Sequence, residues 1–289
     1  EKFKKLIEKA RNASKIYPGI EQVSYSKKRL KPVSARDLPE IEQPESLWGG
    51  FLYPGCITQL NAEPGAGKST IAYNLAALGA QGKEFAGEVF SGPLTTLYVD
   101  LETPTWLRTL KIEAICGERP ESFYLLDELH LSQDIDELIP ICMADKYDLI
   151  VLDTQSKVFG LQDENDNSQA TRAATLVTQL AKETGAGILL IHHTSKGGNT
   201  KKVYSGRGAS AIAGSVDIVA NLEVLDPNTV NISVAKSRIP AEFRSITLRK
   251  IGDDRFDRVA SEETGARLEL YRCQDFIINL LSDGMQHRT

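Results

Sequence analysis

The chain has 289 residues, 41% hydrophobic and 25% charged, which is typical of a folded globular protein and excludes a disordered one. A formal net charge of −5 argues against a protein that coats nucleic acid over its whole surface, although a local basic patch stays open. We expect a cytoplasmic protein with reduced thiols and no membrane contact. The four cysteines form no CxxC pair, no signal-peptide pattern is present, and no apolar stretch approaches the roughly 20 residues of a membrane helix.

Residues 1–46 predict an amphipathic helix followed by a linker. Phe3, Leu6, Ile7 and Ala10 recur at helical spacing with lysines between them, and this apolar stripe needs a partner. The prolines and mixed charges that follow are typical of a linker.

Residues 47–258 alternate short apolar runs with helical patterns. The runs "CITQLN", "TTLYVDL", "DLIVLDT" and "GILLIHH" lack polar alternation, which indicates strands covered on both faces. Later, "NTVNISVAKSR" and "FRSITLRKIGDDRF" alternate apolar and polar residues, as antiparallel strands do. The prediction is an α/β fold with a mainly parallel central sheet flanked by helices and antiparallel strands at its C-terminal edge.

A phosphate-binding loop follows the first of these strands. "AEPGAGKST" matches the P-loop pattern, except that Ala62 replaces the first glycine. Backbone NH groups of such a turn and the helix after it face phosphate, Lys68 would neutralise the β and γ phosphates, and Ser69 would bind magnesium. ATP and Mg²⁺ are therefore the expected ligands, although an ordinary Gly/Ser-rich turn is the alternative. The predicted nucleotide-binding residues here are Glu63, Pro64, Gly65, Ala66, Gly67, Lys68, Ser69 and Thr70.

Two further strands end in carboxylates. Asp153 closes "DLIVLDT", where a second magnesium ligand is expected beside Ser69, an aspartate that caps a helix or turn being the alternative. Asp100 and Glu102 close "LYVDLE", and Glu102 is our candidate for the base that polarises the attacking water. The alternative is that Glu102 caps the helix that begins near Pro104.

In this order, the motifs resemble those of the RecA-type ATPases, specifically the hexameric replicative helicases of the RepA and DnaB kind. "LWGGFLYPGCITQLNAEPGAGKST", "DLIVLDT", "IHHTSKG", "SGRGASAIAGSVDIV" and "VAKSRIP" carry the resemblance, from about Leu47 to Phe256. It implies a RecA-like P-loop core.

The resemblance also implies roles for residues outside the P-loop. His193 matches a sensor of the γ phosphate, a wall histidine being the alternative, and His192 points to the other face. The acid-free loop that follows matches a channel loop that contacts DNA, although a solvated basic loop is equally open. Its candidate DNA-binding residues are Lys196, Lys201, Lys202 and Arg207.

"VAKSRIP" matches the KxR pair with which relatives reach the nucleotide of the neighbouring subunit. Lys236 and Arg238 are therefore expected to act in catalysis, and Arg238 is the arginine-finger candidate. An exposed pair on an edge strand is the alternative. Arg108 could stack on adenine or be a surface arginine.

We expect an ATP-hydrolysing, ring-forming helicase core that acts on single-stranded DNA in the replication of a plasmid or mobile element. Its N-terminal helix would dock on the adjacent subunit of a homo-oligomer, hexameric by the resemblance, with a primase, initiator or loader as possible partner. An assembly ATPase of recombination or regulation without unwinding, and a nucleotide-gated scaffold, are the alternatives. Residues 259–289 predict a helical segment that resembles the start of a winged-helix unit.

Overall fold

The computed structural model describes residues 32–38, 40, 43–161, 167–194, 212–239 and 245–259. The chain divides into two compact units, residues 1–43 and 44–289. In the first, the described part holds the short 3₁₀ helix η1 (Ala35–Asp37), capped by the Ser34 hydroxyl. The predicted N-terminal helix, the basic loop residues Lys196, Lys201, Lys202 and Arg207, and the predicted C-terminal segment from residue 260 on lie outside the described residues.

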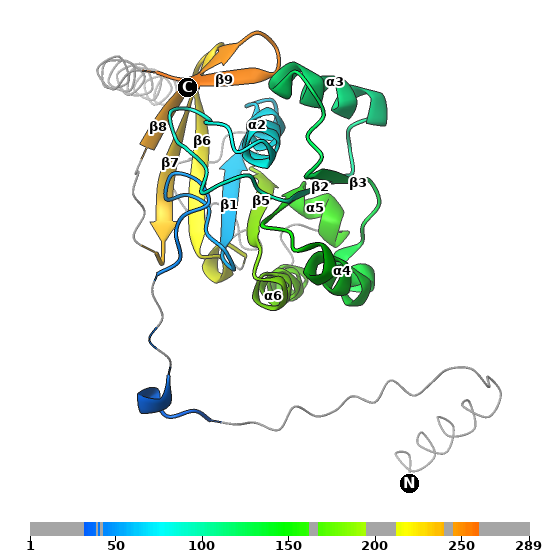
Figure 1. The fold of residues 1–289 in the computed structure, drawn as a ribbon, viewed down its shortest axis with the longest axis vertical. Coiled ribbons are helices and arrows are strands. Elements are labelled where there is room, and N and C mark those ends of the chain that lie inside the picture. The colour runs from blue at the N-terminus through cyan, green and yellow to red at the C-terminus, as the bar shows by residue number, and fades with distance from the viewer. Residues whose placement is uncertain are drawn as a thin grey trace, which may run out of the picture. The chain divides into compact units, whose positions relative to one another are not determined.

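In its described residues, the second unit is built on a nine-stranded sheet with the order β3-β2-β4-β5-β1-β6-β7-β8-β9 (Figure 1). The strands are β1 (Ile57–Ala62), β2 (Thr96–Asp100), β3 (Phe123–Leu126), β4 (Leu149–Asp153), β5 (Gly187–His193), β6 (Ile218–Asp226), β7 (Thr229–Ser237), β8 (Ser245–Ile251) and β9 (Arg255–Arg258). The strands from β3 to β6 in this order pair in parallel, and β7, β8 and β9 continue the sheet antiparallel. The predicted fold class is therefore confirmed.

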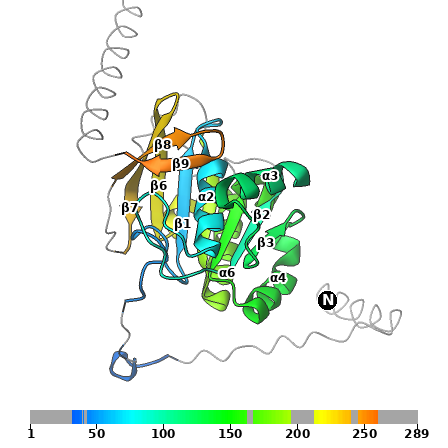
Figure 2. The same cartoon turned by 45° about the horizontal axis from the view of Figure 1, so that its top comes forward.

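Helices cover both faces of the parallel part. They are α2 (Lys68–Ala80), α3 (Thr105–Cys116), α4 (Leu131–Asp145), α5 (Gln155–Phe159) and α6 (Asn167–Thr184). Two buried clusters, one with α2 and α3 and the other with α4, α5 and α6, take alternate residues of the same strands. In β4, Leu149 and Val151 pack on the first face while Ile150 and Leu152 pack on the second, as the period of two in a strand requires. Figure 2 shows α2 in front of the sheet with β9 beside it.

The segment before β1 belongs to the core of this unit. Trp48, Phe51 and Leu52 are almost completely buried, and the Trp48 indole NH donates to the carbonyl of Phe85 at 3.1 Å. Gly49 and Gly50 have positive φ, so the chain turns back sharply between these large side chains. Among the described helices, none is long and apolar enough to cross a membrane.

Candidate functional site

The predicted phosphate loop lies where β1 turns into α2. Gly65 and Gly67 have φ of +82° and +89°, a region in which glycine carries no steric penalty. Gly67 is the N-cap of α2, and Ala66 is buried beneath the turn. The loop therefore directs the N-terminus of a 13-residue helix at the edge of the sheet, the arrangement that binds phosphate groups.

Lys68 lies across this loop. Its side chain is buried, and its Nζ donates to the carbonyl of Glu63 at 2.8 Å. Burial lowers the pKa of Lys68, against the opposing charges of Asp153, Glu102 and Glu63. The ammonium thus sits among three carboxylates at the end of β1 and can exchange a carbonyl partner for phosphate oxygens.

Asp153 lies beside the first turn of α2. The Ser69 hydroxyl hydrogen-bonds its carboxylate, and the Tyr98 hydroxyl donates to its Oδ2 at 2.8 Å. Burial raises the pKa of Asp153 to about 6, and these two hydrogen bonds oppose that shift. A hydroxyl and a carboxylate in contact are the oxygen donors that Mg²⁺ takes together with phosphate oxygens and water, so the pair fits the expected ion.

No group of three or more His, Cys, Asp or Glu side chains that could hold a metal occurs among the described residues. Among the described residues, Cys56, Cys116 and Cys142 are free thiols.

Glu102 follows β2 in a turn beside β4. Asp100 and Asp153 are paired across these parallel strands, and the Thr154 hydroxyl donates to Glu102 Oε1 at 3.3 Å. Helix α3 begins at Thr105 with Pro104 as its N-cap. Glu102 is exposed and lies in the same acidic edge as Asp153.

His193 is the last residue of β5 and is paired with Ala62, the last residue of β1. Because Leu189 and Ile191 pack on the α2 face, strand alternation places His193 on that face too. His192 falls on the opposite face and is buried. His193 therefore stands beside the start of the phosphate loop, where the resemblance places a γ-phosphate sensor.

Arg108 does not lie on the surface. Its side chain is 7% exposed, its Nε donates to the carbonyl of Thr103 at 2.6 Å, and it contacts Asp100 at 4.0 Å and Asp127 at 3.5 Å. The alternative of a surface arginine is wrong. Stacking on adenine stays a prediction, and these contacts argue against it because the guanidinium is already held.

Lys236 and Arg238 lie far from the phosphate loop of their own chain. The backbone of Asp217 connects Arg238 to the start of β1. Its NH donates to the Ile57 carbonyl at 3.0 Å, and its carbonyl accepts the backbone NH of Arg238 at 2.9 Å. Arg238 therefore lies close to Ile57, the first residue of β1. The phosphate loop begins at the other end of this six-residue strand, about 20 Å away at roughly 3.3 Å per residue. Arg238 therefore lies too far from the phosphate loop of its own chain to contact a phosphate bound there.

Both side chains hold a helical turn at residues 212–215. Lys236 Nζ donates to the carbonyls of Ala213, Gly214 and Val216 at 2.7, 3.1 and 3.0 Å. Arg238 donates to the carbonyls of Gly214 and Ser215 at 2.7 and 3.1 Å, and its side chain is 52% exposed.

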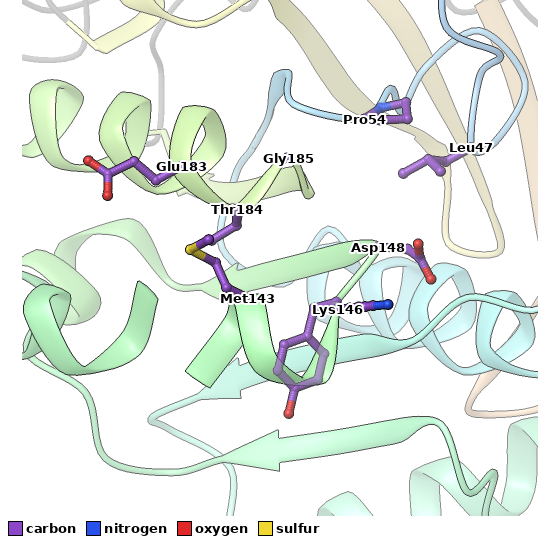
Figure 3. A pocket seen from close by; sticks show the side chains of 9 residues that line it. Leu47, Pro54, Met143, Lys146, Asp148, Glu183, Thr184 and Gly185 are labelled. Carbon is purple, nitrogen blue, oxygen red and sulfur yellow. The ribbon is translucent and has the colours of Figure 1, made fainter. Parts of the chain in front are cut away.

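A separate cavity of about 260 Å³ opens at the amino edge of the sheet. Leu47, Pro54, Asp148 and Gly185, from the segments before β1, β4 and β5, line it, and Figure 3 shows Asp148 and Lys146 on one side with Thr184 and Gly185 on the other. Since the phosphate loop lies at the carboxyl edge, this cavity is not the phosphate site.

Sequence reasoning missed the buried tyrosines of the site. Tyr73 and Tyr98 stack with ring centroids 4.2 Å apart, and Tyr73 donates to Asp100 Oδ2 at 2.7 Å. The one signal was position: Tyr73 follows Ser69 by four residues, so both fall on one face of α2. Phe256 of β9 was also missed, although it packs on the phosphate loop at Gly67.

A known family matches the part of the chain that holds the phosphate loop, Glu102, Asp153 and His193. The family described as AAA domain matches residues 25–199. The DNA repair protein RadA of Mycobacterium tuberculosis (strain H37Rv) is 26% identical over 187 residues, which cover 63% of this chain and 35% of RadA. The chain thus spans about a third of the length of that relative.

Solved structures share the fold. The RadB recombinase matches with a TM-score of 0.53 at 18% identity, covering 72% of this chain and 92% of RadB. A KaiC-like protein from the hyperthermophilic archaeon Pyrococcus horikoshii OT3 matches with a TM-score of 0.53 at 14% identity, covering 77% of this chain and 99% of that protein. The fold is RecA-like.

Proposed function

The chain belongs to the AAA domain family, and we propose that it is a magnesium-dependent ATPase that works on DNA as an assembly of several copies. The observation that carries the proposal is the opposite placement of the phosphate loop and Arg238 at the two ends of β1. One copy supplies the phosphate loop, and the next supplies the guanidinium. Such a head-to-tail interface repeats from copy to copy and generates a ring or a filament.

In this proposal, each candidate site residue has a defined role in ATP hydrolysis. The backbone NH groups of the loop and Lys68 bind the phosphates, and Ser69 and Asp153 would hold the magnesium ion, which would neutralise phosphate charge. Glu102 accepts a proton from water as the water oxygen attacks the γ phosphorus and the bond to the β-phosphate oxygen breaks. His193 contacts the γ phosphate, and Arg238 of the neighbouring copy stabilises the developing negative charge.

The finer proposal is a ring-forming helicase that moves on single-stranded DNA, with Lys196, Lys201, Lys202 and Arg207 as the DNA-binding residues. An absence of acidic residues from this stretch, in a chain of net charge −5, supports it. The second candidate is an assembly ATPase of recombination without unwinding. The names of two similar proteins, a DNA repair protein and a recombinase, favour this second candidate.

Steady-state ATP hydrolysis, measured with and without single-stranded DNA over a range of protein concentrations, tests the shared proposal. We expect the rate of ATP hydrolysis per chain to rise on addition of single-stranded DNA and with increasing protein concentration. A rate independent of DNA and of protein concentration would contradict it. Strand separation of a forked duplex then distinguishes the candidates, because only the helicase displaces the strand; binding and ATP hydrolysis without displacement favour the recombination candidate.

A further inference from the structure

The turn that carries Glu102 is held by side chains rather than by the sheet ladder. Asp100 Oδ1 accepts the backbone NH of Glu102 at 3.0 Å and that of Thr103 at 2.9 Å. One carboxylate oxygen therefore fixes the backbone on both sides of the Glu102 Cα, and with it the direction in which the Glu102 side chain leaves the turn.

Two further backbone groups of the turn are also hydrogen-bonded. Arg108 Nε donates to the Thr103 carbonyl at 2.6 Å, and Leu101 NH donates to the Asp153 carbonyl at 3.4 Å. The first contact comes from α3 and the second from β4. Glu102 thus sits in a short loop whose geometry depends on Asp100 and on its two neighbouring elements.

Asp100 is in turn anchored to the helix of the phosphate loop. It is 2% exposed, and its second oxygen accepts the Tyr73 hydroxyl at 2.7 Å. Tyr73 lies one turn beyond Ser69 on α2 and is fully buried against Tyr98. The chain of contacts from α2 through Tyr73 and Asp100 to the Glu102 turn connects the part that binds phosphate with the part that would deprotonate water.

We propose that Asp100 is the positioning residue for Glu102, and that Tyr73 sets its place relative to the phosphate loop. This inference rests on the proposed catalytic role of Glu102. Burial alone would raise the pKa of Asp100, but the hydrogen bonds from Tyr73, Thr103 and Glu102 outweigh it and the pKa is lowered, so the group accepts these donors as a carboxylate.

The test is a cycle of variants measured by kcat and KM for ATP. Asp100→Ala removes the acceptor of both NH groups, and we expect kcat to fall on the order of 100-fold with KM unchanged, since a misplaced catalytic group costs about that much. Asp100→Asn keeps one acceptor oxygen and should recover most of kcat. Tyr73→Phe keeps the ring stack and should give a smaller loss of kcat, again without a change in KM.

The decisive comparison places Asp100→Ala in a Glu102→Gln background, in single-turnover reactions with excess protein. If Asp100 acts through Glu102, the second change adds no further loss. The same fold-loss in both backgrounds, or a raised KM with kcat intact, would overturn the inference. Thr58→Val is the matched control, because it removes a buried hydroxyl bonded to the Phe51 carbonyl at 2.7 Å and is expected to leave kcat unchanged.

Glu102→Gln alone distinguishes a failure of the proposed role of Glu102 from a failure of its positioning by Asp100. If this variant keeps full turnover, the proposed role of Glu102 fails and the inference fails with it. If it is inactive while Asp100→Ala turns over normally, the role of Glu102 stands and only the positioning by Asp100 is refuted.

Discussion

Asp100 and Asp153 occupy paired positions at the ends of β2 and β4, and each accepts a hydrogen bond from a buried tyrosine. The Tyr73 hydroxyl donates to Asp100 at 2.7 Å and the Tyr98 hydroxyl donates to Asp153 at 2.8 Å. The two tyrosine rings stack on each other. Two buried carboxylates thus stand side by side with different partners: Asp100 is held by backbone NH groups, whereas Asp153 faces Ser69. The pKa of Asp100 is lowered and that of Asp153 is raised.

The raised pKa of Asp153 predicts a dependence of stability on pH. Burial raises it from 3.8 to about 6, so the folded chain binds this proton more tightly than the unfolded chain. The stabilisation is complete below about pH 4 and is lost as the pH rises through 6, by on the order of 3 kcal/mol. Relative to Asp153→Asn, the free energy of unfolding of the parent chain should therefore fall between pH 4 and 7.5 in the absence of Mg²⁺.

Chemical denaturation of the two proteins across this pH range measures that difference. Adding Mg²⁺ with ATP at pH 7.5 should stabilise the parent chain more than Asp153→Asn, since a metal ion binds the carboxylate form. A difference that stays constant with pH, or equal stabilisation of both proteins, would contradict the assignment of Asp153.

The phosphate loop predicts unequal effects at its two left-handed glycines. Both Gly65→Ala and Gly67→Ala place a side chain at positive φ, which costs about 1 kcal/mol. At Gly67 the added Cβ would also lie 3.3 Å from the Phe256 ring, whereas at Gly65 nothing lies within 4 Å. Gly67→Ala should therefore lower the free energy of unfolding more than Gly65→Ala in the nucleotide-free chain.

Urea denaturation of the two single variants gives this comparison, and Phe256→Leu in each background is the control. The smaller side chain should reduce the excess loss at Gly67 and leave the loss at Gly65 unaltered. Equal losses of unfolding free energy for Gly65→Ala and Gly67→Ala would show that the Phe256 ring moves aside with no loss of stability.

The sequence predicted the parts of the site that depend on neighbouring residues in the chain. A glycine-rich turn between a strand and a helix, and carboxylates at strand ends, are local patterns, and strand alternation separates His192 from His193. β3 was missed because it is short and half exposed at the sheet edge, with no buried apolar run to mark it. β6 was missed because polar residues break its apolar pattern after the first buried residues.

The partners of Arg108 could not be predicted in the same way. Asp100 is the last residue of β2 and Asp127 follows β3, and their approach to α3 depends on the order of strands in the sheet. The contact between Tyr73 and Asp100 likewise joins residues 27 apart and belongs to no motif. Such long-range side-chain contacts anchor Asp100 and Arg108, which in turn hold the Glu102 turn, and no local pattern reports them.

Arg108 itself gives a test between stacking on adenine and support of the turn. Arg108→Ala removes a donor to the Thr103 carbonyl and leaves Asp100 buried without its cation, so we expect a loss of stability on the order of 3 kcal/mol and a lower kcat. KM for ATP should stay unchanged, whereas loss of a stacking arginine would raise it. Arg119→Ala, which breaks an exposed pair with Glu113, is the control and should cost at most about 1 kcal/mol.

The placement of Arg238 at the far end of β1 predicts complementation between two inactive variants. Lys68→Ala loses the phosphate loop cation but keeps the arginine, and Arg238→Ala keeps an intact loop. Because the two residues serve different copies across one interface, an equal mixture should regain activity at about a quarter of the interfaces, the fraction that random mixing allows. ATP hydrolysis after mixing at constant total protein measures this recovery, and each variant diluted alone is the control. If Arg238→Ala hydrolyses ATP normally by itself, or if mixing restores nothing, the arginine does not act on a neighbour's nucleotide. Lys236→Ala should lower the melting temperature more than Arg238→Ala, because Lys236 donates to the carbonyls of Ala213, Gly214 and Val216, whereas the half-exposed Arg238 donates to only two carbonyls there.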